Sequence, residues 1–201
     1  MHRAAFFFCF SLLKISFLMN KFQKAANNLI VNHRIAKLCA AKPKRKKGEF
    51  MILTQKEMSL LSDLSSQEKL CIEKYGKYAQ SANDPALKQL FESLRATEQK
   101  HLDTLTQMQS GTEVEMPPAP SATESKTACT PSSQSPEQKQ SDAFLCKDAL
   151  SMEKHVSSVY NTSTFEFKSP VMRDTLAHIQ KEEQNHGERL YSYMECNGMY
   201  N

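Results

Sequence analysis

Two Glu-x-x-His pairs carry the clearest chemical signal in the sequence. They are Glu98-x-x-His101 and Glu183-x-x-His186, and residues three apart in a helix lie on one face. Each pair continues an apolar stripe, made by Leu94 with Leu105 and by Ile179 with Leu190. One such pair is common by chance. Two copies on apolar faces instead favour a buried site for divalent metal, because carboxylate and imidazole groups are ligands for such ions.

Two more glutamates complete this pattern. Glu68 and Glu153 each lie thirty residues before the glutamate of a pair, again on an apolar stripe. Four buried carboxylates without compensation are strongly unfavourable, whereas two divalent cations would balance them. One Glu from each of two helices with Glu-x-x-His from the other two is the di-iron or di-manganese carboxylate pattern. The predicted cofactor is therefore two ions of Fe or Mn, with Zn not excluded. The predicted metal ligands are Glu68, Glu98, His101, Glu153, Glu183 and His186.

Other interpretations of these residues stay open. The cluster can also form a hydrogen-bonded polar core of Glu, His and Tyr, or the relic of a metal site. Tyr75 and Tyr160 lie seven residues beyond Glu68 and Glu153, so they can serve as core aromatics or as donors that orient a carboxylate. Residues off the stripes are expected to be solvated, namely His155, His178, Glu73 and Glu182.

Four helices must position these side chains. Thr54-x-x-Glu57 is a capping box that opens a helix over 55–81, and Asp84-Pro85 starts the next, which ends at Gly111. A third helix is expected from about Asp142 to Glu166. A fourth follows Ser169-Pro170 and reaches about Glu195, before Gly198.

The two helical hairpins are copies of one another. A shift of 85 residues aligns eight identities between 68–105 and 153–190 without a gap, the metal-ligand types included. The fold class is thus predicted as all-α, a ferritin-like four-helix bundle built from two repeated hairpins, 51–109 and 142–201. The segment between them, 110–141, is rich in Pro, Ser, Thr and Gln and is expected to be a flexible linker. Its length suits an up-down-down-up bundle, in which the chain crosses the full bundle between parallel helices.

Residues 1–50 differ from the body, 51–201. They hold eleven Lys or Arg and one acid, which leaves the body with a net charge of −6 and argues against nucleic acid as a partner. Back-translated, Lys46–Phe50 is purine-rich, like a bacterial ribosome-binding site before Met51. Three interpretations are open: upstream DNA translated from a mis-assigned start, a targeting segment, or a basic arm. No apolar run reaches the roughly 18 residues of a membrane helix.

Six cysteines are present and none forms a Cys-x-x-Cys motif, which argues against a zinc ribbon. Cys71 and Cys146 fall on apolar stripes and are expected to be buried thiols. Cys129 and Cys196 are expected either to stay reduced or to crosslink to partners.

Several stretches resemble the Coat F family of bacterial spore coat proteins, which is similar in turn to rubrerythrins. The resemblance covers about 52–109 and 142–201 and rests on these stretches: EKLCIEKYGKYAQSANDPALKQLFESL, TEQKHLDTL, EKHVSSVYNTSTFEF, HIQKEEQNHGE and NGMYN. The rubrerythrin pattern implies Glu68, Glu98 and His101 as ligands, and the repeat carries over Glu153, Glu183 and His186. No rubredoxin-like Cys-x-x-Cys module is present, which puts peroxidase activity in doubt.

This resemblance implies a structural spore coat protein, made in the mother-cell cytoplasm, with other coat proteins as partners. The ligand set leaves an alternative, a di-metal oxidoreductase acting on peroxide, O₂ or superoxide, and a third, a metal-storage module. Whether the chain is an enzyme, and whether it forms a homodimer, is left open by the sequence.

Overall fold

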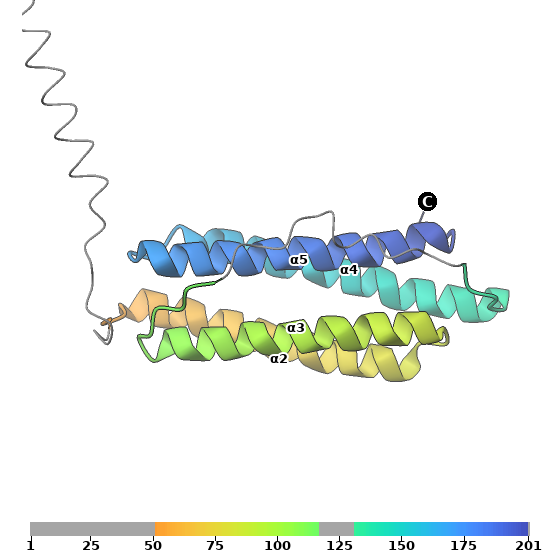
Figure 1. Ribbon diagram of the computed structural model, residues 1–201, viewed down its shortest axis with the longest axis horizontal. Coiled ribbons are helices and arrows are strands. Elements are labelled where there is room, and N and C mark those ends of the chain that lie inside the picture. Colours follow the sequence, from red (N-terminus) through yellow and green to blue (C-terminus); the bar gives the residue numbers. More distant parts are fainter. Residues whose placement is uncertain (1–50, 117–130, 201) are drawn as a thin grey trace, which may run out of the picture. The chain divides into compact units, whose positions relative to one another are not determined.

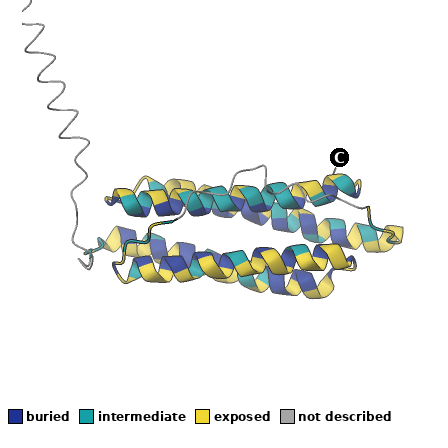
Figure 2. Ribbon diagram, in the orientation of Figure 1, coloured by how far each residue is buried: buried dark blue, intermediate teal, exposed yellow. Residues whose placement is uncertain are grey.

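The computed structural model describes residues 51–116 and 131–200, and these residues form four α-helices without any strand. The helices are α2 (Gln55–Ser81), α3 (Pro85–Gln109), α4 (Pro136–Thr164) and α5 (Pro170–Cys196). In Figure 2 the buried residues gather on the faces that the helices turn toward one another. The predicted all-α four-helix bundle is confirmed. The predictions for residues 1–50, and for the middle of the linker, lie outside the described residues.

Side-chain caps begin the helices. The capping box of Thr54 and Glu57 is present in both directions, and Asp84 and Ser169 cap α3 and α5 with proline at the first helical position. The expected start of the third helix near Asp142 is wrong, because α4 begins at Pro136. Its signal is a second capping box, in which the Ser135 hydroxyl accepts from Gln138 N–H and the Gln138 side chain accepts from Ser135 N–H. The polar composition of the linker concealed this signal.

Two glycines follow the ends of α3 and α5, the second helix of each hairpin. Gly111 and Gly198 have φ of 79° and 59°, a left-handed conformation that glycine adopts without strain. After α3, Gly111 N–H donates to Met108 O and Thr112 N–H to Gln107 O. This is a Schellman motif, which satisfies carbonyls that the helix end would leave unpaired. The bonds of Gly198 and Met199 after α5 repeat it.

The helices run up, down, down and up. Helix α3 ends at one end of the bundle and α4 begins at the other (Figure 1), as the long linker predicted. Within the bundle α2 packs on α3 and α4 on α5, and the hairpins meet through α2 with α4 and α3 with α5. The first residues after α3 cross to the second hairpin, where Thr175 donates a hydrogen bond to Val114 O at 2.5 Å.

Each hairpin is clamped by a carboxylate of the other. Asp142 on α4 is fully buried and accepts hydrogen bonds from the backbone N–H groups of Asn83 and Asp84, in the turn between α2 and α3. Glu57 on α2 accepts from Lys168 N–H, in the turn between α4 and α5. Since Glu57 and Lys168 occupy the positions of Asp142 and Asn83 after the 85-residue shift, the two clamps are copies. The repeat therefore fixes how the hairpins dock.

Asp142→Ala should destabilise the fold by about 3 kcal/mol, because it leaves two backbone donors of the α2–α3 turn without their acceptor. Urea unfolding followed by circular dichroism measures this change. Asp174→Ala, at an exposed position of α5, is the matched control and should stay within about 0.5 kcal/mol. Equal unfolding midpoints for the two variants would show that the clamp contributes nothing.

No helix in the described ranges is long and apolar enough to cross a membrane.

Candidate metal centre

Six side chains from all four helices meet inside the bundle. Glu68 comes from α2, Glu98 and His101 from α3, Glu153 from α4, and Glu183 and His186 from α5, and each is at most 3% exposed. The structure therefore brings together every ligand predicted from the sequence. They meet because the Glu-x-x-His pairs lie on the inward stripes of α3 and α5, whereas the single glutamates lie on those of α2 and α4.

The ligand atoms form two overlapping groups. One contains Glu68, Glu98, His101 and Glu183, and the other contains Glu98, Glu153, Glu183 and His186; within each group the ligand atoms lie within 4.8 Å of one another. Glu98 and Glu183 belong to both groups, and the two imidazoles stack with centroids 5.7 Å apart. Two ions could therefore sit side by side, with Glu98 and Glu183 offering an oxygen to each.

Contacts within the groups are close. His101 Nδ1 lies 3.0 Å from Glu98 Oε2 and 3.1 Å from Glu183 Oε1. His186 Nδ1 lies 2.9 Å from Glu98 Oε1. Neither of these two atoms forms a hydrogen bond, so their contact is an ion pair whose geometry does not suit a hydrogen bond.

The cluster also leaves buried oxygens without a hydrogen bond. They are Glu68 Oε2, Glu98 Oε1, Glu153 Oε2 and both carboxylate oxygens of Glu183. Unpaired buried carboxylate oxygens are unfavourable in a folded protein, and divalent cations accept such oxygens as ligands. The donor set thus fits two divalent ions.

Without metal, the cluster balances its charge with protons. Burial opposes the charged imidazole, but the carboxylates around His101 and His186 outweigh it and hold both pKa values well above 6.5. Burial and the neighbouring carboxylates raise the pKa of Glu68 well above its ordinary value, and burial does the same for Glu153.

The pKa values of Glu98 and Glu183 shift in the opposite direction, to below the ordinary value. Burial opposes their ionisation, yet the contacts with His101 and His186 leave both pKa values below the ordinary value. In the metal-free site, charged imidazoles therefore compensate the carboxylates of Glu98 and Glu183, whereas Glu68 and Glu153 ionise less readily than ordinary glutamates.

Two tyrosines join the hairpins at the site. The hydroxyl of Tyr75 on α2 donates to Glu153 on α4, and that of Tyr160 on α4 donates to Glu68 on α2. Burial raises both tyrosine pKa values well above 10, so the hydroxyls keep their protons. Of the two roles left open for these tyrosines, the structure supports orientation of a carboxylate. Each does so for the opposite hairpin, because the antiparallel helices place position 75 beside position 153.

Two residues expected at the surface lie beside the cluster instead. Glu182 Oε2 is 2.9 Å from His101 Nε2 and 3.5 Å from His178 Nε2, and the side chains of His178 and Glu182 are only 8% and 22% exposed. The expectation of solvated charges was wrong here because α3 packs over this edge of α5. The adjacent acids Glu182-Glu183 were the only sequence signal. His155 is exposed, and Glu73 is exposed and paired with Lys77, both as expected.

Two buried cysteines of the bundle lie outside the ligand groups. Cys71 and Cys146 are buried free thiols, as predicted. Burial raises the pKa of both thiols, so they stay protonated and unreactive. Cys196 is disulfide-bonded, whereas Cys129 lies outside the described residues.

Comparison with known proteins supports this architecture. Residues 141–201 match the family model of the Coat F domain. The solved structure of a two-domain protein from Anabaena variabilis, containing DJ-1/ThiJ/PfpI-like and ferritin-like domains, is similar with a TM-score of 0.53 and 17% identity, over 82% of this chain and 41% of that one. That identity shows the fold alone, and this chain spans less than half of that protein. A comparison with curated proteins returned no match.

Proposed function

From a Coat F domain at residues 141–201 within a ferritin-like four-helix bundle, we propose that this chain is a structural protein of the spore coat. It would be made in the mother cell and would assemble with other coat proteins around the forespore. Tagged chain expressed in sporulating cells should appear at the forespore surface under fluorescence microscopy. Uniform fluorescence throughout the mother cell would contradict the coat assignment.

The bundle would hold a dinuclear centre of Fe or Mn. One ion would use Glu68 and His101, the other would use Glu153 and His186, and Glu98 with Glu183 would serve both. The observation that carries this proposal is the pair of overlapping ligand groups with unpaired buried carboxylate oxygens. Because ligands come from four helices, bound metal would join both hairpins and add its binding free energy to the stability of the fold.

Metal content is the direct test. The chain is expressed with Fe or Mn supplied, and bound metal is counted by elemental mass spectrometry. We expect about two ions per chain, falling to near zero in the double variant Glu98→Gln/Glu183→Gln, which keeps the side-chain volume. Glu73→Gln removes an exposed carboxylate of α2 and should retain both ions. A metal-free wild type under replete conditions would refute the centre and leave a coat protein with a polar core.

An oxidoreductase acting on peroxide, O₂ or superoxide is the second candidate, and the complete ligand set favours it. Bound Fe or Mn would supply the redox chemistry, and Tyr75 and Tyr160 would orient the terminal carboxylates. The sequence has no Cys-x-x-Cys motif for electron transfer, so the assay supplies the electrons. Peroxide consumption by the metal-loaded chain with an artificial reductant tests this candidate. A rate equal to that of Glu98→Gln/Glu183→Gln would eliminate it.

A further inference from the structure

The two histidines of the centre have different surroundings. His101 uses its second nitrogen, Nε2, in a 2.9 Å contact with Glu182 Oε2. The same carboxylate oxygen lies 3.5 Å from His178 Nε2. The Glu182 carboxylate therefore lies behind His101, whose Nδ1 is directed into the centre.

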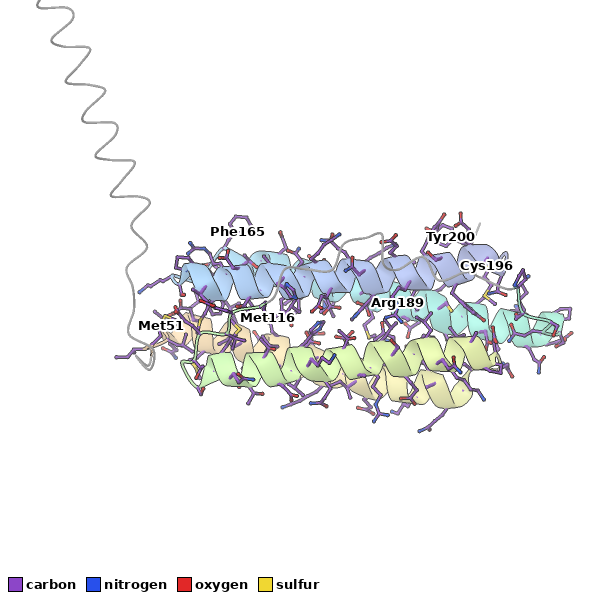
Figure 3. The ribbon with its side chains drawn as sticks, viewed as in Figure 1. Met51, Met116, Phe165, Arg189, Cys196 and Tyr200 are labelled. Carbon is purple, nitrogen blue, oxygen red and sulfur yellow. The ribbon has the colours of Figure 1, made fainter. Side chains whose placement is uncertain are left out.

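The corresponding positions around His186 lack this support. After the 85-residue shift, Glu182 becomes Thr97 and His178 becomes Ser93. The Thr97 hydroxyl donates to Ser93 O of its own helix, and the Ser93 hydroxyl accepts from Arg189 at 2.8 Å. Figure 3 shows Arg189 on α5, in the space beside α3. The repeat therefore does not supply His186 with a carboxylate equivalent to Glu182.

A carboxylate that accepts the outer N–H of a metal-bound imidazole fixes its ring orientation and raises its basicity, and removing such a partner typically lowers metal affinity 10–100-fold. We propose that the two metal positions are unequal. The position of Glu68 and His101 binds first and more tightly, with Glu182 as its positioning residue, and the position of Glu153 and His186 fills second. This inference rests on the proposed dinuclear centre.

Stepwise loading with Mn²⁺ tests the order. Metal-free chain is titrated at one fixed pH, and native mass spectrometry counts chains with zero, one and two ions. We expect singly loaded chains to exceed the statistical proportion for two equivalent sites. Repulsion between neighbouring ions would give the same excess, so variants must identify the position.

Glu182→Ala should weaken binding of the first ion about 10–100-fold and leave binding of the second ion nearly unchanged. The affinities of the two binding steps should therefore become more similar. His186→Ala should retain the first step, whereas His101→Ala should lose it. Glu92→Ala, which removes an exposed carboxylate of α3, should change neither. Helical circular dichroism of the metal-free variants confirms that each is folded.

Thr97→Glu places a carboxylate at the position equivalent to Glu182 and should strengthen the second step. Equal first-step affinities in wild type and Glu182→Ala, with two Mn²⁺ still bound, would overturn the inequality and leave the dinuclear centre intact. No bound Mn²⁺ in the wild type would instead overturn the centre itself.

Discussion

The metal-free protein is expected to be most stable near pH 4.5, to lose stability as the pH rises above that value, and to lose it more steeply beyond about 6.5. His101 and His186 have pKa values well above 6.5 in the fold, so their contribution is fully present below pH 6.5 and is lost as the pH rises through the folded values. Glu68 and Glu153 also have raised pKa values, so from about pH 4.5 upward the folded chain binds more protons than the unfolded chain and stability falls with pH.

Below pH 4.5 the stability of the metal-free protein is expected to fall as the pH decreases. The pKa values of Glu98 and Glu183 lie below 4.5 in the fold, as does that of Glu57, whose hydrogen bonds from Lys168 N–H and Thr54 outweigh burial. Their contribution is present above the unfolded pKa and is lost as the pH falls through the folded values. The two effects together place the stability maximum near pH 4.5, because Glu68 and Glu153 already lower the stability above that value.

Thermal unfolding in chelator across pH 4–9 measures this profile. Each proton held only by the folded state lowers the unfolding free energy by about 1.4 kcal/mol per pH unit, so several such groups produce a large decline in melting temperature. The double variant His101→Gln/His186→Gln should show a flatter alkaline limb. A wild-type melting temperature that is constant or rising between pH 6.5 and 9 would contradict the proton balance of the site.

The sequence predicts the helices and the ligand set because both depend on periodic patterns within one helix. Capping residues determine where α2, α3 and α5 begin, and the inward stripes carry all six predicted ligands. The 85-residue repeat places the second Glu-x-x-His pair at the position equivalent to the first, so each pair supports the interpretation of the other as part of a site. These features need no knowledge of how the helices are rotated against one another.

Features between helices could not be predicted in the same way. Glu182 and Glu73 both lie off the stripes, yet only Glu182 faces a neighbouring helix and reaches His101. Asp142 gave no sequence signal as a clamp, because its partners are backbone N–H groups of another hairpin. The sequence places Tyr75 seven residues after Glu68 on the same helix face. In the antiparallel packing of α2 and α4, its hydroxyl instead donates a hydrogen bond to Glu153.

Metal loading should release about four protons per chain for two bound ions. His101 and His186 would each give up the Nδ1 proton, and Glu68 and Glu153 would each give up a carboxyl proton, because the fold raises the pKa of all four groups. Two divalent cations would then balance the charge of four carboxylates beside two neutral imidazoles. Loading would therefore exchange protons for metal inside the bundle.

Isothermal titration of metal-free protein with Mn²⁺ in buffers of different ionisation enthalpy counts the released protons. The overall binding constant should increase by up to about four powers of ten per pH unit while all four groups are protonated. His101→Ala should release about one proton fewer. Glu73→Gln, which alters only an exposed side chain, should match the wild type. Binding of two ions without proton release would mean that the four groups are already deprotonated in the metal-free fold, and the decline in stability above pH 6.5 should then be absent too.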